Sequence, residues 1–111
     1  MAYDFELAER LRDALCNVPE VVERRMFGGL AFLIGGNMTV VASSKGGLMI
    51  RADPATAASL VETTEAEFVE MRGRQMRGWL HIAAEAVQSE TELRPWVERA
   101  VDYSSTLPQK S

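Results

Sequence analysis

Few side chains in this sequence could carry out catalysis, since the chain contains one cysteine and one histidine. Cys16, expected near the core side of a helix, and His81, expected on a strand, could form a thiolate–imidazole pair, but a free cysteine is more often a buried structural residue. One cysteine and one histidine are too few for a closed zinc site in a single chain. The glutamates between residues 62 and 70 have no spacing that fixes two carboxylates for acid–base chemistry. The sequence therefore predicts neither an enzyme nor a metal or cofactor site.

Arginines in the middle of the chain are better candidates for binding: Arg24, Arg25, Arg51, Arg72, Arg74 and Arg77. The segment Arg72-Gly73-Arg74 would place two guanidinium groups beside backbone N–H donors, which suits a phosphate or another anion. The alternative is a solvated surface on which these arginines pair with the abundant glutamates. Gly73 and Gly78 have the outer spacing of a phosphate-binding loop, but Trp79 and Leu80 follow where that loop needs lysine and serine or threonine.

Composition indicates a single globular domain spanning residues 1–111. The chain is 47% hydrophobic and 25% charged, both ordinary for such a domain. A net charge of −4 argues against direct DNA binding, because nucleic-acid-binding domains usually carry a basic excess. No apolar run approaches the roughly 20 residues that span a bilayer, and the N-terminus lacks a secretory signal pattern. With a single cysteine and hence no internal disulfide, a cytoplasmic location is expected.

The hydrophobic pattern changes twice along the first half of the chain. Apolar residues at three-and-four spacing predict a helix over 4–17, which Pro19 ends. Four short β-prone runs follow, at residues 21–27, 30–34, 38–43 and 47–52. Glycine-containing segments separate them, as tight hairpins with positive φ require. Asp53 and Pro54 then begin a short helix, as its N-cap and first-turn residue.

The second half predicts two more strands and a closing helix. The strands cover 68–71 and 76–83, around a loop at 72–75. Ser89 and Glu92 have capping-box spacing ahead of a helical apolar pattern. Pro95 would remove one helix bond, so the helix is expected to begin nearer Thr91 or Glu92, or to bend.

These elements predict an α+β fold with two layers. The connections between the first four strands are too short for crossover helices, so the sheet should be antiparallel, with helices on one face. The expected order is helix, four strands, helix, two strands and helix. The ordered core is expected over about residues 4–103, followed by a polar tail.

Alternation of side chains along the strands predicts one sheet face against the helices and one bare face. Met76, Leu80 and Ile82 would share the covered face, while Thr39 and Val41 would share the bare one. Altogether the bare face should carry Val41, Met49, Arg51, Arg77, Trp79 and His81. Large apolar groups left exposed commonly mark an interface, so this face is a candidate homodimer or partner surface. The alternative is that the sheet curls and buries these side chains itself.

Met26-Phe27-Gly28-Gly29 is most simply a structural turn, in which glycine adopts conformations that strain other residues. Together with Leu48, Ile50 and Arg51 in the fourth strand, Asp53 directly after it and Trp96 in the last helix, it resembles the TfoX/Sxy competence-regulator N-terminal domain family. The segment from Met71 to Trp79 resembles a block found in short family members, and the similarity covers residues 4 to 107.

The resemblance implies a non-catalytic, transcription-linked role in DNA-uptake competence. It also implies action by contact with a protein partner such as the transcription machinery. Longer family members carry a second, helical domain after this one, and the present sequence ends just after the first. Activities of that second domain are therefore not expected here.

Overall fold

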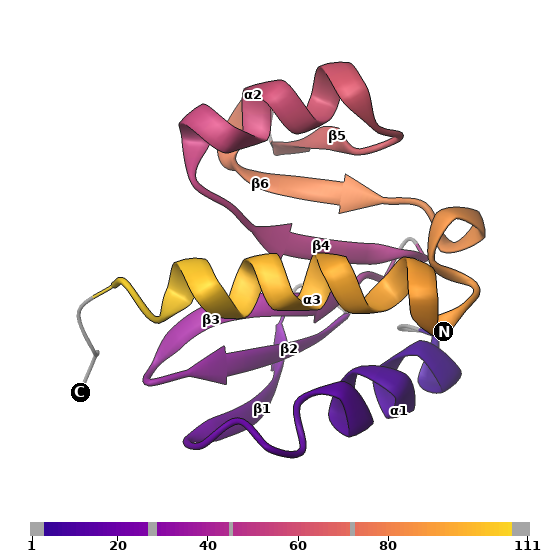
Figure 1. The fold of residues 1–111 in the computed structure, drawn as a ribbon, viewed down its shortest axis with the longest axis vertical. Helices are drawn as coiled ribbons and strands as arrows, with labels where there is room; N and C mark the ends of the chain where they lie inside the picture. The colour runs from indigo at the N-terminus through magenta and orange to yellow at the C-terminus, as the bar shows by residue number, and fades with distance from the viewer. Residues whose placement is uncertain (1–3, 27–28, 45, 72, 108–111) are drawn as a thin grey trace.

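The computed structural model describes residues 4–26, 29–44, 46–71 and 73–107, which form an α+β fold (Figure 1). The elements, in chain order, are α1 (Phe5–Ala14), β1 (Val21–Met26), β2 (Gly29–Ile34), β3 (Asn37–Ala42), β4 (Leu48–Arg51), α2 (Pro54–Thr63), β5 (Glu67–Met71), β6 (Arg74–Ile82), the 3₁₀ helix η1 (Ala84–Val87) and α3 (Glu90–Ser104). The predicted order is confirmed, and η1 is an addition that no sequence pattern signals.

The strands of the described residues form one antiparallel sheet in the order β1-β2-β3-β4-β6-β5. Hairpins join β1 to β4 in sequence order. The chain then leaves through α2, returns as β5, and turns back to place β6 beside β4. This crossover makes β1 and β5 the two edges of the sheet.

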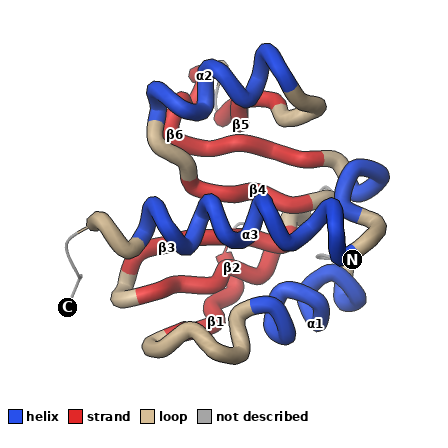
Figure 2. The backbone as a smooth tube through the Cα atoms, in the orientation of Figure 1, coloured by secondary structure: helices blue, strands red, loops and turns tan. Residues whose placement is uncertain are grey.

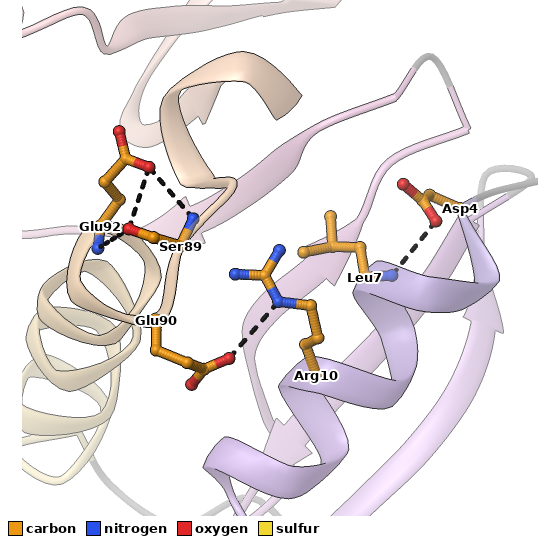
Figure 3. Close-up of polar contacts among 6 residues, drawn as sticks. All are labelled: Asp4, Leu7, Arg10, Ser89, Glu90 and Glu92. Atoms are coloured by element: carbon orange, nitrogen blue, oxygen red, sulfur yellow. Dashed lines mark hydrogen bonds and ion pairs between the residues drawn. The ribbon is translucent and has the colours of Figure 1, made fainter.

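All three α-helices of the described residues pack on the same face of the sheet (Figure 2). α3 lies on β3 and β4, while α2 lies on β6 and β5. α1 packs beside α3, and an ion pair of 3.5 Å between Arg10 Nε and Glu90 Oε1 links them (Figure 3). Leu11, Leu60 and Leu93, one from each helix, join a single buried cluster. No helix of the described residues lies on the other face of the sheet.

The core lies between the helices and the covered face of the sheet. Its largest fully buried side chains include Phe32, Leu11, Leu48, Ile50, Leu80, Ile82 and Leu93. Branched aliphatic residues of this kind remove much apolar surface from water and have few rotamers to lose. The alternating strand residues that supply this core also determine which side chains point to the bare face.

Helix α1 is shorter than the sequence predicts. Asp4 is its N-cap, because the carboxylate accepts hydrogen bonds from the backbone N–H groups of Glu6 and Leu7. Figure 3 shows the bond from Leu7. The helix ends at Ala14 instead of residue 17, and Cys16 lies beyond it and is exposed. Pro19 disfavours helical backbone at Val18, whose N–H bonds instead to the Leu15 carbonyl in a tight turn. The expectation that Cys16 faces the core is therefore wrong.

Helix α3 begins earlier than expected. Ser89 is the N-cap, and a complete capping box joins it to Glu92: Ser89 Oγ accepts from the Glu92 N–H at 3.2 Å, and Glu92 Oε1 accepts from the Ser89 N–H at 3.0 Å (Figure 3). The helix begins at Glu90, so the expected start at Thr91 or Glu92 is wrong, and Pro95 lies inside it. Thr91 and Pro95 are exposed, so the carbonyl that loses its N–H donor is open to water.

Candidate functional site

A row of paired residues crosses the sheet from edge to edge on its bare face. The members, from β1 to β5, are Arg24, Ala31, Val41, Met49, His81 and Glu67. Residues directly opposite each other in an antiparallel ladder point to the same face. The neighbours of the row show which face this is, because Glu23 pairs with Arg12 of α1 and Ile50 lies in the core. We call these six residues the cross-sheet row.

The sheet curls on this face and forms a half-open hollow of about 330 Å³, which four residues of the row line: Val41, Met49, His81 and Glu67. Met26 lines it from β1, Val41 and Met49 form part of it, and Phe68 and Val69 line it from β5. Residues of both edge strands therefore border one hollow, which requires a strongly curved sheet. Its lining is mainly apolar, with the polar groups of His81 and of two glutamates at its border.

The curvature buries some of the predicted bare face and leaves the rest accessible. Val41 is 3% exposed, whereas Met49 and His81 are half-buried in the hollow. Arg51 and Trp79 are directly opposite each other in β4 and β6, half-buried and beside the hollow rather than in it. Arg77 belongs to β6, but its side chain lies outside the described residues. Three of the predicted interface residues thus meet in one hollow.

Two irregular ladders change the predicted alternation. The pairing of β2 with β3 shifts between Phe32 and Leu33, and Thr39 turns toward α3, where its Oγ1 lies 2.8 Å from Ser104 Oγ. The pairing of β5 with β6 shifts near Phe68, and Met76 is 37% exposed instead of joining the core. The shifts leave one extra residue in β3, Thr39, and three in β6, residues 77–79, and an odd number of extra residues reverses the alternation beyond them. The predicted faces of Thr39 and Met76 are therefore wrong.

His81 connects the hollow to the β3–β4 hairpin. Its Nε2 atom lies 2.9 Å from the Gly46 carbonyl oxygen. Gly47 next to it has φ +79°, and a Cβ there would lie 2.5 Å from the Ile82 carbonyl oxygen. Cys16 lines a different surface hollow, with Arg12 and Glu23 on the helix side. The structure therefore does not bring Cys16 and His81 together as a thiolate–imidazole pair.

Met26 and Gly29, the two ends of the motif Met26-Phe27-Gly28-Gly29, pair with each other across β1 and β2. Phe27 and Gly28 lie outside the described residues. Gly29 does not have a positive φ, but a Cβ at this position would lie 2.4 Å from the Ala42 carbonyl oxygen. Its requirement for glycine is therefore the close approach of β3, and the predicted reason, a positive φ, is wrong for this residue.

The predicted anion seat lies at the tip of the β5–β6 hairpin. Met71 pairs with Arg74, so the turn is shorter than the expected loop over 72–75, and Arg74 belongs to β6. Gly73 has φ +76° and open space around its Cα. Arg74 is exposed, and Arg72 lies outside the described residues.

The two edge strands differ in their free charge. The Arg12 guanidinium donates hydrogen bonds of 2.6 and 2.7 Å to Glu23 and lowers the pKa of that carboxyl. Glu23 is the only acidic residue of β1, and the positive charge of Arg12 balances its negative charge. Arg24 and Arg25 remain on β1, and Glu67 and Glu70 lie on β5. None of these four joins an ion pair with another described residue. β1 is therefore a positive edge and β5 a negative one.

The described residues offer neither a metal cluster nor a membrane span. They contain no group of three or more His, Cys, Asp or Glu side chains that could hold a metal ion. No helix in the described part of the chain is long and apolar enough to cross a membrane.

Comparison with known proteins identifies the fold family. The family model of the TfoX N-terminal domain matches residues 13–104. A comparison with curated proteins gave no match. The matched segment runs from the end of α1 through α3 and includes every strand described here. The chain therefore belongs to the TfoX N-terminal domain family.

Proposed function

We propose that this protein is a non-catalytic regulatory domain that acts in the cytoplasm by contacting another protein through the bare face of its sheet. Membership of the TfoX N-terminal domain family supports a competence-related role. The motif resemblance implies regulation linked to transcription, for which the transcription machinery is the expected partner class. Cys16 and His81 lie apart, which weighs against the enzymatic alternative.

The observation that carries this proposal is the half-open apolar hollow around the cross-sheet row. Met26 and Met49 are half-buried there, and no helix covers them. Apolar side chains in a concave, partly desolvated surface are typical of the central part of a protein interface. Methionine side chains are flexible and polarizable, so they adapt to the shape of a partner.

Replacing one side chain of the hollow tests the proposal. Met49→Asp places a charge in the hollow without touching the core, because Ile50 and Leu48 fill the other face of β4. Phe5→Asp is the matched control, since Phe5 is 58% exposed on the helix side. Transcripts of DNA-uptake genes are measured in host cells that express each form, and circular dichroism checks the fold. The wild type and Phe5→Asp should change these transcripts, and Met49→Asp should not.

A folded Met49→Asp variant with full effect on the transcripts would contradict the proposal. An absence of any effect of the wild-type protein on transcripts would contradict the regulatory role itself.

A second candidate function is anion binding at the β5–β6 hairpin. The turn at Gly73 has a positive φ, and Arg74 beside it is exposed. Such a turn suits binding of phosphate groups by backbone N–H donors and guanidinium groups. Binding of a labelled single-stranded oligonucleotide should then fall steeply with salt and disappear in Arg74→Glu. Contact through the apolar hollow should depend little on salt.

A further inference from the structure

The cross-sheet row has opposite charges at its two ends. Arg24 lies at the β1 end and Glu67 at the β5 end, with Ala31, Val41 and Met49 among the residues between them. Arg24 and Glu67 are both exposed, and neither forms an ion pair with another described residue. A surface with this pattern is complementary to itself when it is turned end for end.

The strand directions allow such a rotation. Neighbouring strands in the described sheet are all antiparallel, so β1 and β5 at its two edges run in opposite directions. A two-fold rotation about an axis parallel to the strands leaves the strand directions unchanged. It reverses the order of the residues in the cross-sheet row, so the β1 end of one copy faces the β5 end of the other. It brings β1 of each copy to the antiparallel β5 edge of the other copy, and Arg24 to the partner subunit's Glu67.

We propose that the bare face of the sheet binds the same face of a second copy of this chain about such an axis. This inference rests on the proposed function of the face as a protein-contact surface, and it adds a second copy of this chain to the proteins proposed to bind there. The contact is isologous, because one patch serves both copies, and it closes as a dimer instead of growing into a filament.

The curvature of the sheet fits this arrangement. Two curled sheets that meet along their edges place their hollows face to face, and the apolar linings leave water together. Val22 on β1 is 51% exposed, pairs with Leu33 and therefore shares the bare face with Arg24. The dimer covers this side chain as well as Met76 on β6. It also covers both exposed sheet edges, which otherwise offer unpaired backbone groups to any passing strand.

Charge reversal with rescue tests the pairing. Sedimentation of the full chain over a concentration series gives the dimer dissociation constant for wild type, Arg24→Glu, Glu67→Arg and the double variant. Each single reversal should raise the constant by about tenfold or more, because every dimer contains the pair twice and like charges repel. The double variant should return close to the wild-type value. Arg94→Glu, at an exposed position on α3, is the matched control and should leave the constant unchanged.

A monomeric wild type at all concentrations would overturn this inference, as would single reversals without effect or a double variant without rescue. These failures are distinct from failure of the proposed function. If the wild type is monomeric but Met49→Asp still abolishes its effect on transcripts, the bare face remains the proposed contact surface and only the dimer is excluded. If Met49→Asp instead breaks the dimer but leaves the effect on transcripts unchanged, the face binds a second copy and has no regulatory role.

Discussion

The two faces of this sheet are built from the same strands but from different kinds of side chain. On β4, Leu48 and Ile50 are fully buried under the helices, while Met49 and Arg51 on the other face are half-buried. The covered face consists mainly of branched aliphatic residues with few rotamers. The bare face carries methionine, tryptophan, arginine and histidine, whose apolar parts bury well while their shapes or polar tips adapt to a changing neighbour.

The difference separates what folds the domain from what it presents to other molecules. A core of aliphatic residues needs no partner other than its own helices. Under the proposed function, the concave face of adaptable side chains, with opposite charges at its edges, is completed by a second molecule. Three predictions use this contrast, in order of expected effect.

The largest effect is expected for neighbouring residues on opposite faces of β4. Ile50→Ala should lower the free energy of unfolding by about 2–5 kcal/mol, since the cavity would lie in a fully packed core. Met49→Ala should cost about 1 kcal/mol or less, because the half-exposed side chain loses less buried surface. Urea unfolding measures both values. Equal losses for the two variants would show that the bare face contributes to folding as much as the core does.

An intermediate effect is expected at two hairpin glycines. Gly29→Ala should destabilise the fold by about 1–3 kcal/mol, because the new Cβ would meet the Ala42 carbonyl oxygen and force β2 and β3 apart. Gly73→Ala should lower the free energy of unfolding by about 1 kcal/mol. Open space surrounds this position, so the new Cβ meets no atom and the cost comes only from holding alanine at a positive φ. Thermal unfolding of the two variants compares them. A larger loss at Gly73 would contradict the assignment of Gly29 as a site of close backbone approach.

The smallest effect is expected for the ion pair on the helix side of β1. The pKa of Glu23 is lower in the folded chain than its ordinary value of 4.5, so the pair stabilises the fold above that pH and loses its contribution as the pH falls through the lowered pKa. Arg12→Gln should therefore reduce stability near pH 7 by less than about 1 kcal/mol, as for other exposed pairs. The difference from wild type should vanish in acid. A difference that persists there would mean that Arg12 acts through packing.

Arg12→Gln also separates the two sides of β1. It should leave self-association unchanged, because Arg12 and Glu23 lie on the helix side. Arg24→Glu should behave in the opposite way, with little effect on unfolding and a strong effect on association.

The sequence predicts the elements of this fold well because local periodicity and capping determine most of them. Asp53 caps α2 and Ser89 caps α3, as their spacing indicates. The ladder shifts near Phe32 and Phe68 are not predictable in this way, because they depend on how neighbouring strands fit together. The errors at Thr39 and Met76 follow from these shifts.

The candidate site is predicted in part for the same reason. Alternation alone places Val41, Met49 and His81 on one face, and the structure brings them into one hollow. Met26 and the residues of β5 also line that hollow, and sequence reasoning missed their part in it. Alternation gives the face of a residue but not the curvature of the sheet, which brings the two edge strands toward each other. The basic residues of β1 and the acidic residues of β5 are visible in the sequence. Only the strand order shows that these two strands are the opposite edges of the sheet.

Photocrosslinking in living cells tests the central claim most directly, that the bare face is the contact surface of this domain. A photoreactive phenylalanine analogue is introduced at Met49, in the hollow, or at Glu98, exposed on α3. If the bare face is the contact surface, the analogue at Met49 should form a protein adduct and the analogue at Glu98 should form none. An adduct with a second copy should have twice the mass of the monomer. Adducts from Glu98 alone, or equal yields from both positions, would contradict the claim.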